Sequence, residues 1–142
     1  MIQQKKYLEQ YVSLQKEYDA VYKHIMRNEL DVNGPYTKKL EDSIKKITGR
    51  KYALATISGT GAIWAAIYAL DLIGKRVAIA GYNYEACAHP FIALCEPVFF
   101  DCDEDMLIDI NQIPKNCEAL MLVNYNGNVV DYDRVRSKFK GK

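Results

Sequence analysis

Two glycines and two hydroxyl side chains are grouped in the short stretch Ser58-Gly59-Thr60-Gly61. The stretch follows an apolar run at residues 52–58 and opens an alanine-rich segment, so it has the position of a turn between a strand and a helix. Glycines let the backbone come close to a ligand, and the first amides of a helix attract an anion. The residue types and spacing therefore indicate a phosphate-binding turn, with a plain tight turn capped by Thr60 as the alternative.

Two familiar phosphate-binding motifs are excluded at this turn. A dinucleotide-binding fingerprint needs a third small residue where Trp64 stands, and a P-loop needs a Gly-Lys pair that the turn lacks. An unrelated Rossmann-like fold that binds a nucleotide or another phosphate through Gly59 and Gly61 stays open as an alternative.

The elements that would position this turn alternate between helical periodicity and short apolar runs. Residues 4–28 carry apolar side chains at three- and four-residue spacing, and a second helix is predicted at 36–48, between Pro35 and a capping Gly49. From residue 51 the pattern becomes strand, helix, strand, which is typical of a parallel sheet with helices on its faces. Strands are predicted at 52–58, 76–80, 97–101 and 120–125, and helices at 60–72, 84–95 and 131–139.

This pattern predicts an α/β fold in which two N-terminal helices precede a mainly parallel sheet with covering helices. We divide the chain into an N-terminal helical segment, residues 1–50, and an α/β domain, residues 51–142. Ligands of such sheets collect at the carboxyl ends of strands, which is where the Ser58–Gly61 turn is expected. Within the helix at 60–72, residues 62–70 are apolar all round except for Trp64 and Tyr68, so we expect this stretch to be buried deeply.

Composition and charge argue against a nucleic-acid-binding, membrane-binding or secreted protein. The 142 residues carry a net charge of +1, which provides no field for recruiting nucleic acid or a membrane surface. The N-terminus lacks the apolar core of a signal peptide, and four cysteines without paired spacing indicate reduced thiols, so we expect a cytoplasmic protein.

The acidic cluster at residues 101–109 has Met106 where a calcium loop needs glycine, so we expect a solvated loop and no metal site. His89, inside an apolar helix, is expected to be packed.

Further motifs occur in a fixed order along the chain. They are Asn33-Gly34-Pro35-Tyr36 with Leu40-Glu41, Gly49-Arg50-Lys51-Tyr52-Ala53, Ser58-Gly59-Thr60, Pro97-Val98-Phe99-Phe100-Asp101 and Val123-Asn124-Tyr125-Asn126-Gly127. Together they resemble the N-terminal portion of the DegT/DnrJ/EryC1/StrS family of pyridoxal-phosphate-dependent sugar aminotransferases, which have the type I aminotransferase fold. The resemblance implies that residues 51–142 are part of the cofactor-binding large domain.

The resemblance also implies a cofactor site. The phosphate of pyridoxal 5'-phosphate would be held by Ser58, Gly59, Thr60 and Gly61, and Tyr84 would stack on the pyridine ring. The alternative for Tyr84 is a side chain that covers the sheet edge.

Two further family residues, an aspartate that pairs with the pyridine nitrogen and a lysine that bonds the cofactor, follow later in those enzymes. Neither motif is found before Lys142, so no catalytic residue is assigned. Asn83 and Cys87 stand where the family usually has hydroxyl residues.

For a complete enzyme the resemblance implies amino transfer from an amino acid such as glutamate to a keto-sugar nucleotide, in polysaccharide or sugar biosynthesis. This chain is expected to be a truncated homologue or an N-terminal fragment, inactive alone, that forms a homodimer or pairs with a full-length homologue. A non-catalytic assembly module is the alternative. Without later strands, the sheet would have an open edge and exposed helix faces.

Overall fold

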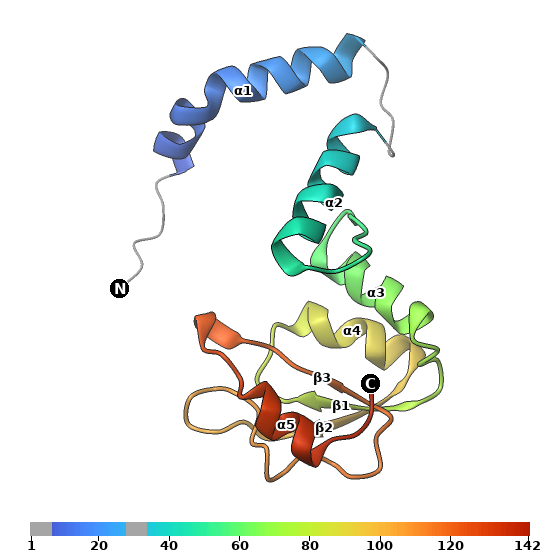
Figure 1. Ribbon diagram of the computed structural model, residues 1–142. Helices are drawn as coiled ribbons and strands as arrows, with labels where there is room; N and C mark the ends of the chain where they lie inside the picture. The colour runs from blue at the N-terminus through green and yellow to red at the C-terminus, as the bar shows by residue number, and fades with distance from the viewer. Residues whose placement is uncertain (1–6, 28–33) are drawn as a thin grey trace. The chain divides into compact units, whose positions relative to one another are not determined.

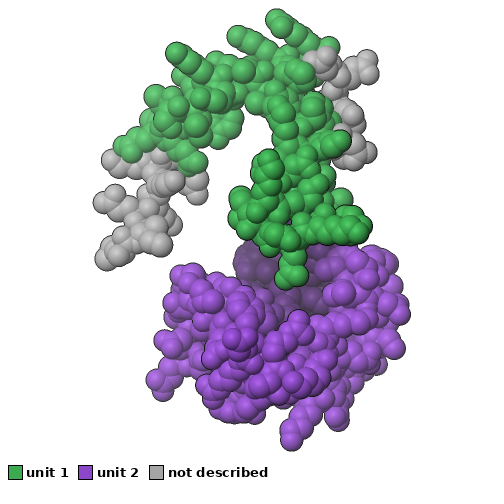
Figure 2. All heavy atoms as spheres, viewed as in Figure 1, with its two compact units in different colours: residues 1–55 green, residues 56–142 purple. Residues whose placement is uncertain are grey.

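The computed structural model describes residues 7–27 and 34–142. The chain divides into two compact units, Met1–Ala55 and Thr56–Lys142 (Figure 2). The outer ends of the helix predicted at 4–28, and the Asn33 that begins the first family motif, lie outside the described residues. None of the described helices combines the length and the apolarity that crossing a membrane requires.

The first unit consists of two helices, α1 (Tyr7–Arg27) and α2 (Pro35–Thr48). Pro35 occupies the first turn of α2, where its missing amide costs nothing. Gly49 ends the helix at φ +66°, a left-handed conformation that favours glycine. The helix predicted between Pro35 and Gly49 is therefore confirmed with both of its end signals.

The second unit is a small parallel α/β structure (Figure 1). Its three strands lie in the order β2-β1-β3, and β1 pairs in parallel with both neighbours. The elements are α3 (Gly59–Ala69), β1 (Arg76–Ala80), α4 (Glu85–Leu94), β2 (Glu96–Phe100), β3 (Ala119–Met121), the 3-10 turn η1 (Tyr125–Gly127) and α5 (Tyr132–Lys138).

The strand predicted at residues 52–58 is wrong. This segment is irregular, and the side chains of Tyr52, Leu54 and Ile57 are largely exposed. The segment pairs with no strand among the described residues. The amide of Ala55 donates instead to the Glu41 carboxylate at 3.0 Å. An apolar, β-prone run becomes a strand only where another strand offers hydrogen bonds.

The core of this unit lies on both faces of β1. Val77 and Ile79 point to one face, where they pack with Ile67 of α3 and Phe91 of α4. Ala78 and Ala80 point to the other face, where they pack with Ile108, Val130, Val135 of α5 and Phe139. Helices α3 and α4 accordingly cover one face of the sheet and α5 the other (Figure 1).

Two burial expectations are also wrong. Helix α3 has a single buried residue, Ile67, because the sheet and α4 cover only one side of it, and Tyr68 on the same helix is exposed. His89 is exposed on α4, whose buried side is formed by Ala88, Pro90 and Phe91. An apolar helix is therefore left half covered.

Candidate functional site

The connections of the second unit bring three loops to one edge of the sheet. Helices α3 and α4 each precede a parallel strand and return the chain toward the strands' amino ends, so both helices begin at the carboxyl edge (Figure 1). The turn η1 follows β3 and lies at the same edge (Figure 1). This is the edge at which α/β sheets bind ligands.

The first turn of α3 is formed by the predicted phosphate-binding residues. Ser58 is the N-cap, and its hydroxyl accepts a hydrogen bond from the amide of Gly61 at 3.0 Å. The capping residue is therefore Ser58 and not Thr60. Among the described residues, the structure records no acceptor for the amides of Gly59 and Thr60. The turn thus leaves two amides at the positive end of a helix without a recorded acceptor in the described chain.

Space around the turn suits the close approach of an anion. A side-chain carbon added at Gly59 would meet nothing within 4 Å, and Ser58 and Gly59 are both exposed. Gly61 is more enclosed, since a carbon there would lie 3.5 Å from the Ser58 hydroxyl oxygen. Gly59 therefore forms the open side of the turn, while Gly61 completes the cap.

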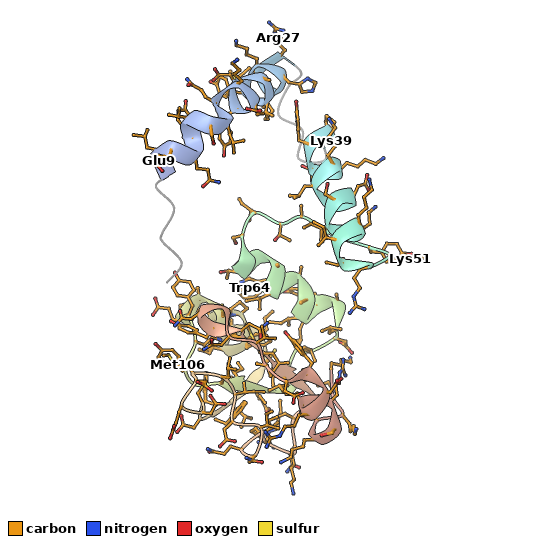
Figure 3. The ribbon with its side chains drawn as sticks, turned by 60° about the vertical axis from the view of Figure 1, so that its left-hand side comes forward. Glu9, Arg27, Lys39, Lys51, Trp64 and Met106 are labelled. Atoms are coloured by element: carbon orange, nitrogen blue, oxygen red, sulfur yellow. The ribbon has the colours of Figure 1, made fainter. Side chains whose placement is uncertain are left out.

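Tyr84 is the N-cap residue of α4, and 67% of its surface is exposed. It therefore lies at the same edge as the start of α3, with a ring face free for contact. Trp64 follows further along α3 and is half buried (Figure 3).

Asn83 precedes Tyr84 and is an unsatisfied polar side chain. Both side-chain amide atoms of Asn83 are buried, and neither has a hydrogen-bond partner within the part of the chain that is described. Leaving such a group unpaired costs about 1–3 kcal/mol. The side-chain amide next to Tyr84 in sequence therefore lacks hydrogen-bond partners in the described chain.

A tyrosine pair joins the loops that follow β1 and β3. The rings of Tyr82 and Tyr125 pack edge to face, with centroids 4.7 Å apart. A side-chain hydrogen bond with Tyr125 raises the pKa of Tyr82 above its ordinary value. Sequence reasoning missed this pair, because two aromatics 43 positions apart meet only through the sheet order.

Asn124 was also missed as a structural residue. Its side-chain oxygen accepts from the amide of Val130 at 3.1 Å, and its side-chain nitrogen donates to the hydroxyl of Tyr132 at 2.9 Å. Asn126 and Gly127, the predicted turn, both have positive φ, +53° and +83°. Asn124 therefore clamps the loop that carries Tyr125.

The acidic cluster forms its own loop and binds its own backbone. Asp103 accepts hydrogen bonds from the amides of Asp105 and Leu107, and Asp109 accepts from the amide of Asn111 and the side chain of Gln112. Met106 lies at the tip of this loop with φ +60° (Figure 3). No group of metal-binding side chains is found in the described ranges, 7–27 and 34–142.

Comparison with known proteins identifies the relatives of this chain. A sequence model of the DegT/DnrJ/EryC1/StrS aminotransferase family matches residues 12–140. Among solved structures, DesV of S. venezuelae is similar with a TM-score of 0.83 and 24% identity, over 91% of this chain and 37% of that one. An aminotransferase from Psychrobacter cryohalolentis is similar with a TM-score of 0.77 and 25% identity, over 87% of this chain and 33% of that one.

A putative sugar aminotransferase of Streptococcus pneumoniae, Spr1654, has been solved in PLP and PMP forms. Its PMP form is similar with a TM-score of 0.74 and 23% identity, over 82% of this chain and 31% of that one. The chain therefore spans about a third of the length of these solved relatives. Because the family match extends over most of the sequence, the chain belongs to the DegT/DnrJ/EryC1/StrS aminotransferase family.

Proposed function

We propose that residues 56–142 form the front part of the pyridoxal 5'-phosphate site of a nucleotide-sugar aminotransferase. The observation that carries the proposal is the first turn of α3, where Ser58 makes the cap and leaves the amides of Gly59 and Thr60 without a protein acceptor in the described chain. The hydroxyl of Thr60 adds a third donor. These groups suit the phosphate of the cofactor.

Tyr84 supplies the second contact in this proposal. Its exposed ring would stack on the pyridine ring, which adds about 0.5–1.5 kcal/mol to binding. The buried, unpaired amide of Asn83 lies next to it in sequence. When bound, the cofactor supplies an electron sink for reactions at the carbon that bears the amino group.

We do not expect this chain alone to catalyse amino transfer. Four of the five lysine amines of the second unit, those of Lys75, Lys138, Lys140 and Lys142, contact Glu118, Asn111, Arg136 and Leu70, respectively. The fifth, Lys115, has no recorded contact among the described residues and stands in no motif that the family resemblance assigns to cofactor chemistry. The helix end contributes about 0.3–1 kcal/mol and each neutral hydrogen bond about 0.5–1.5 kcal/mol. Micromolar affinity needs about 8.2 kcal/mol, so we expect weaker binding than that and no turnover.

The complete reaction belongs to a larger assembly in this proposal. It would be amino transfer from an amino acid such as glutamate to a keto-sugar nucleotide, with this chain as a homodimer or paired with a full-length homologue. A role as a non-catalytic assembly module is consistent with the same site. A cytoplasmic location agrees with the four free cysteines.

The test is a titration of the purified chain with pyridoxal 5'-phosphate, followed by absorbance and equilibrium dialysis. We expect saturable binding above about 1 μM, competition by inorganic phosphate and no amino transfer from glutamate. Tyr84→Leu should weaken binding severalfold, whereas the matched variant Tyr68→Leu, at another exposed tyrosine, should not. Binding of UDP without pyridoxal 5'-phosphate would favour a Rossmann-like nucleotide binder. Turnover with a single lysine adduct would contradict the expected inactivity.

A further inference from the structure

The segment that connects β1 with α4, residues 81–84, is held by the backbone at its two ends. At its start, the amide of Gly81 donates to the carbonyl of Phe100, the last residue of β2, at 2.8 Å. At its end, the carbonyl of Tyr84 accepts from the amide of Cys87 in the first turn of α4 at 2.9 Å. These bonds fix where the segment begins and ends.

The middle of the segment has few bonds of its own. In the described chain, no hydrogen bond is recorded for the amides of Tyr82, Asn83 and Tyr84. The side-chain amide of Asn83 is unpaired, and the side chain of Tyr84 makes no capping hydrogen bond. Because a segment with so few hydrogen bonds opens at a low cost in free energy, the backbone alone would hold the ring of Tyr84 only loosely.

The ring of Tyr125 supports this segment from the neighbouring loop. It packs edge to face with the ring of Tyr82, with centroids 4.7 Å apart, and the two side chains share a hydrogen bond. Among the described residues, this pair is the only ring contact or side-chain hydrogen bond recorded for residues 81–84. Tyr125 lies in η1, where its carbonyl accepts from the amide of Asn128 at 2.9 Å. The pair thus joins the segment to a turn that is itself closed by a hydrogen bond.

Tyr82 and Tyr84 are separated by a single residue. Two residues of extended chain span at most about 7 Å, so a fixed position for Tyr82 confines Tyr84 to a small region beside the start of α4. Ordering a side chain before a ligand arrives removes part of the entropic cost of binding. The contact between Tyr82 and Tyr125 can therefore affect a ligand that meets Tyr84 alone.

We propose that Tyr125 is a positioning residue of the cofactor site: through its ring contact with Tyr82 it holds residues 81–84 so that the ring of Tyr84 faces the ligand. This rests on the proposed function, in which Tyr84 stacks on the pyridine ring, and it adds to that site a residue that itself touches no ligand. Without the contact, the binding-competent conformation is less populated, and the apparent dissociation constant rises in proportion. An edge-to-face aromatic pair corresponds to a factor of roughly 2–10 in such a population.

The test compares the binding of pyridoxal 5'-phosphate and of inorganic phosphate by equilibrium dialysis. Tyr125→Leu should weaken binding of pyridoxal 5'-phosphate about threefold to tenfold and leave binding of inorganic phosphate, which needs only the first turn of α3, unchanged. Tyr82→Leu breaks the same contact from the other side and should have the same effect. Tyr125→Phe retains the ring contact and should restore most of the affinity. The matched control, Val129→Ala at an exposed residue of the same loop, should alter neither ligand.

A double variant separates positioning from direct contact with the ligand. In the Tyr84→Leu background there is no ring left to position, so adding Tyr125→Leu should weaken binding of pyridoxal 5'-phosphate no further. A full additional loss would show that Tyr125 touches the ligand itself and would overturn the inference. Equal weakening of both ligands by Tyr125→Leu would also overturn it, because the effect would then extend to the turn of α3.

Hydrogen exchange in the absence of ligand provides a readout that does not depend on the cofactor. Tyr125→Leu should make the amide of Cys87, bonded to Tyr84, exchange about threefold faster or more, whereas the amide of Cys95, bonded to Phe91 at the other end of α4, should not change. Unchanged exchange at Cys87, with pyridoxal 5'-phosphate still bound by the unaltered chain, would overturn this inference alone. If the unaltered chain bound no pyridoxal 5'-phosphate, both the proposed function and the positioning role would be wrong, whatever the exchange at Cys87.

Discussion

The amide of Gly61 donates a hydrogen bond to the hydroxyl of Ser58 at 3.0 Å and closes the first turn of α3. Ser58 therefore stabilises the helix, while the neighbouring amides of Gly59 and Thr60 stay available in the described structure. The two hydroxyls of the turn thus have separable roles, a structural one for Ser58 and a ligand-binding one proposed for Thr60.

Replacing Ser58 should cost stability, and replacing Thr60 should cost ligand binding. Loss of an N-cap hydroxyl typically destabilises a protein by about 0.5–2 kcal/mol, so Ser58→Ala should lower the free energy of unfolding by about 1 kcal/mol in urea titrations. Ser58→Asn retains the cap and should cost little. Thr60→Ala should leave unfolding nearly unchanged while weakening pyridoxal 5'-phosphate binding. Equal destabilisation by Ser58→Ala and Thr60→Ala would contradict this division.

Asn124 should contribute more to stability than its partner Tyr132. Asn124→Ala removes bonds to both the Val130 amide and the Tyr132 hydroxyl, whereas Tyr132→Phe removes only the second. At about 0.5–1.5 kcal/mol per net hydrogen bond, Asn124→Ala should cost roughly twice as much as Tyr132→Phe. Chemical unfolding followed by circular dichroism measures both, and equal costs would show that the Val130 bond contributes nothing.

The four cysteines should react with alkylating agents at different rates. Burial raises the pKa of the Cys117 and Cys95 thiols, so at pH 8 a smaller fraction of each is the reactive thiolate than in a free cysteine. Cys117 is also only 8% exposed. Iodoacetamide labelling mapped by mass spectrometry should modify Cys102 before Cys117, and urea should abolish the difference. Simultaneous labelling of the folded chain would mean that its core opens as a unit.

Asp109 should titrate below an ordinary aspartate. Hydrogen bonds from Gln112 and from the amide of Asn111 lower the pKa of its carboxyl group. A lowered folded-state pKa gives stability that is present above the unfolded pKa and is lost as the pH falls through the folded one. Carbon-detected NMR titration should show Gln112→Ala moving the Asp109 midpoint upward, toward its ordinary value. An unchanged midpoint would assign the lowering to the backbone amide.

Gly141→Ala should release the C-terminal segment from β3. The added methyl group would collide with the Glu118 carbonyl and the Phe139 ring. The two backbone bonds of Lys142, to the carbonyl of Glu118 just before β3 and from the amide of Leu120 in β3, should therefore be lost. The amide of Leu120 should then exchange with solvent faster, while that of Ile79 in β1 should not. Gly74→Ala provides a comparison at a glycine that lies away from β3 in sequence and has positive φ, +68°. Unchanged exchange at Leu120 would mean that the segment does not protect this edge.

Strands of the second unit were predictable where their hydrogen-bond partners lie in the same unit. Arg76–Ala80 is buried on both faces and appears as a strand with its predicted bounds, because its neighbours lie in the same chain. The run at 52–58 has similar local chemistry but no strand beside it, so the same pattern failed. Strand propensity shows that a segment can adopt an extended conformation, but the segment becomes a strand only when another strand pairs with it.

The site was predictable only where its chemistry is local. The cap and glycines of Ser58–Gly61 can be recognised from adjacent residues, although the sequence does not decide whether Ser58 or Thr60 is the cap. The contact of Tyr82 with Tyr125 depends on how β1 and β3 lie side by side. No spacing rule contains that information. The ligand roles of Ser58, Gly59, Thr60, Gly61 and Tyr84 stay predictions.

The alternating burial of β1 has a consequence for how the protein diverges among relatives. Ile79 shares its cluster with Ile67 and Phe91, while Ala78 shares the opposite cluster with Val135. A size change at Ile79 should therefore be compensated within α3 or α4, and one at Ala78 within α5 or its loop. Among relatives, substitutions within one of the two clusters should covary, and substitutions in different clusters should vary independently. The five residues of β1 thus divide the core into two groups that should evolve separately.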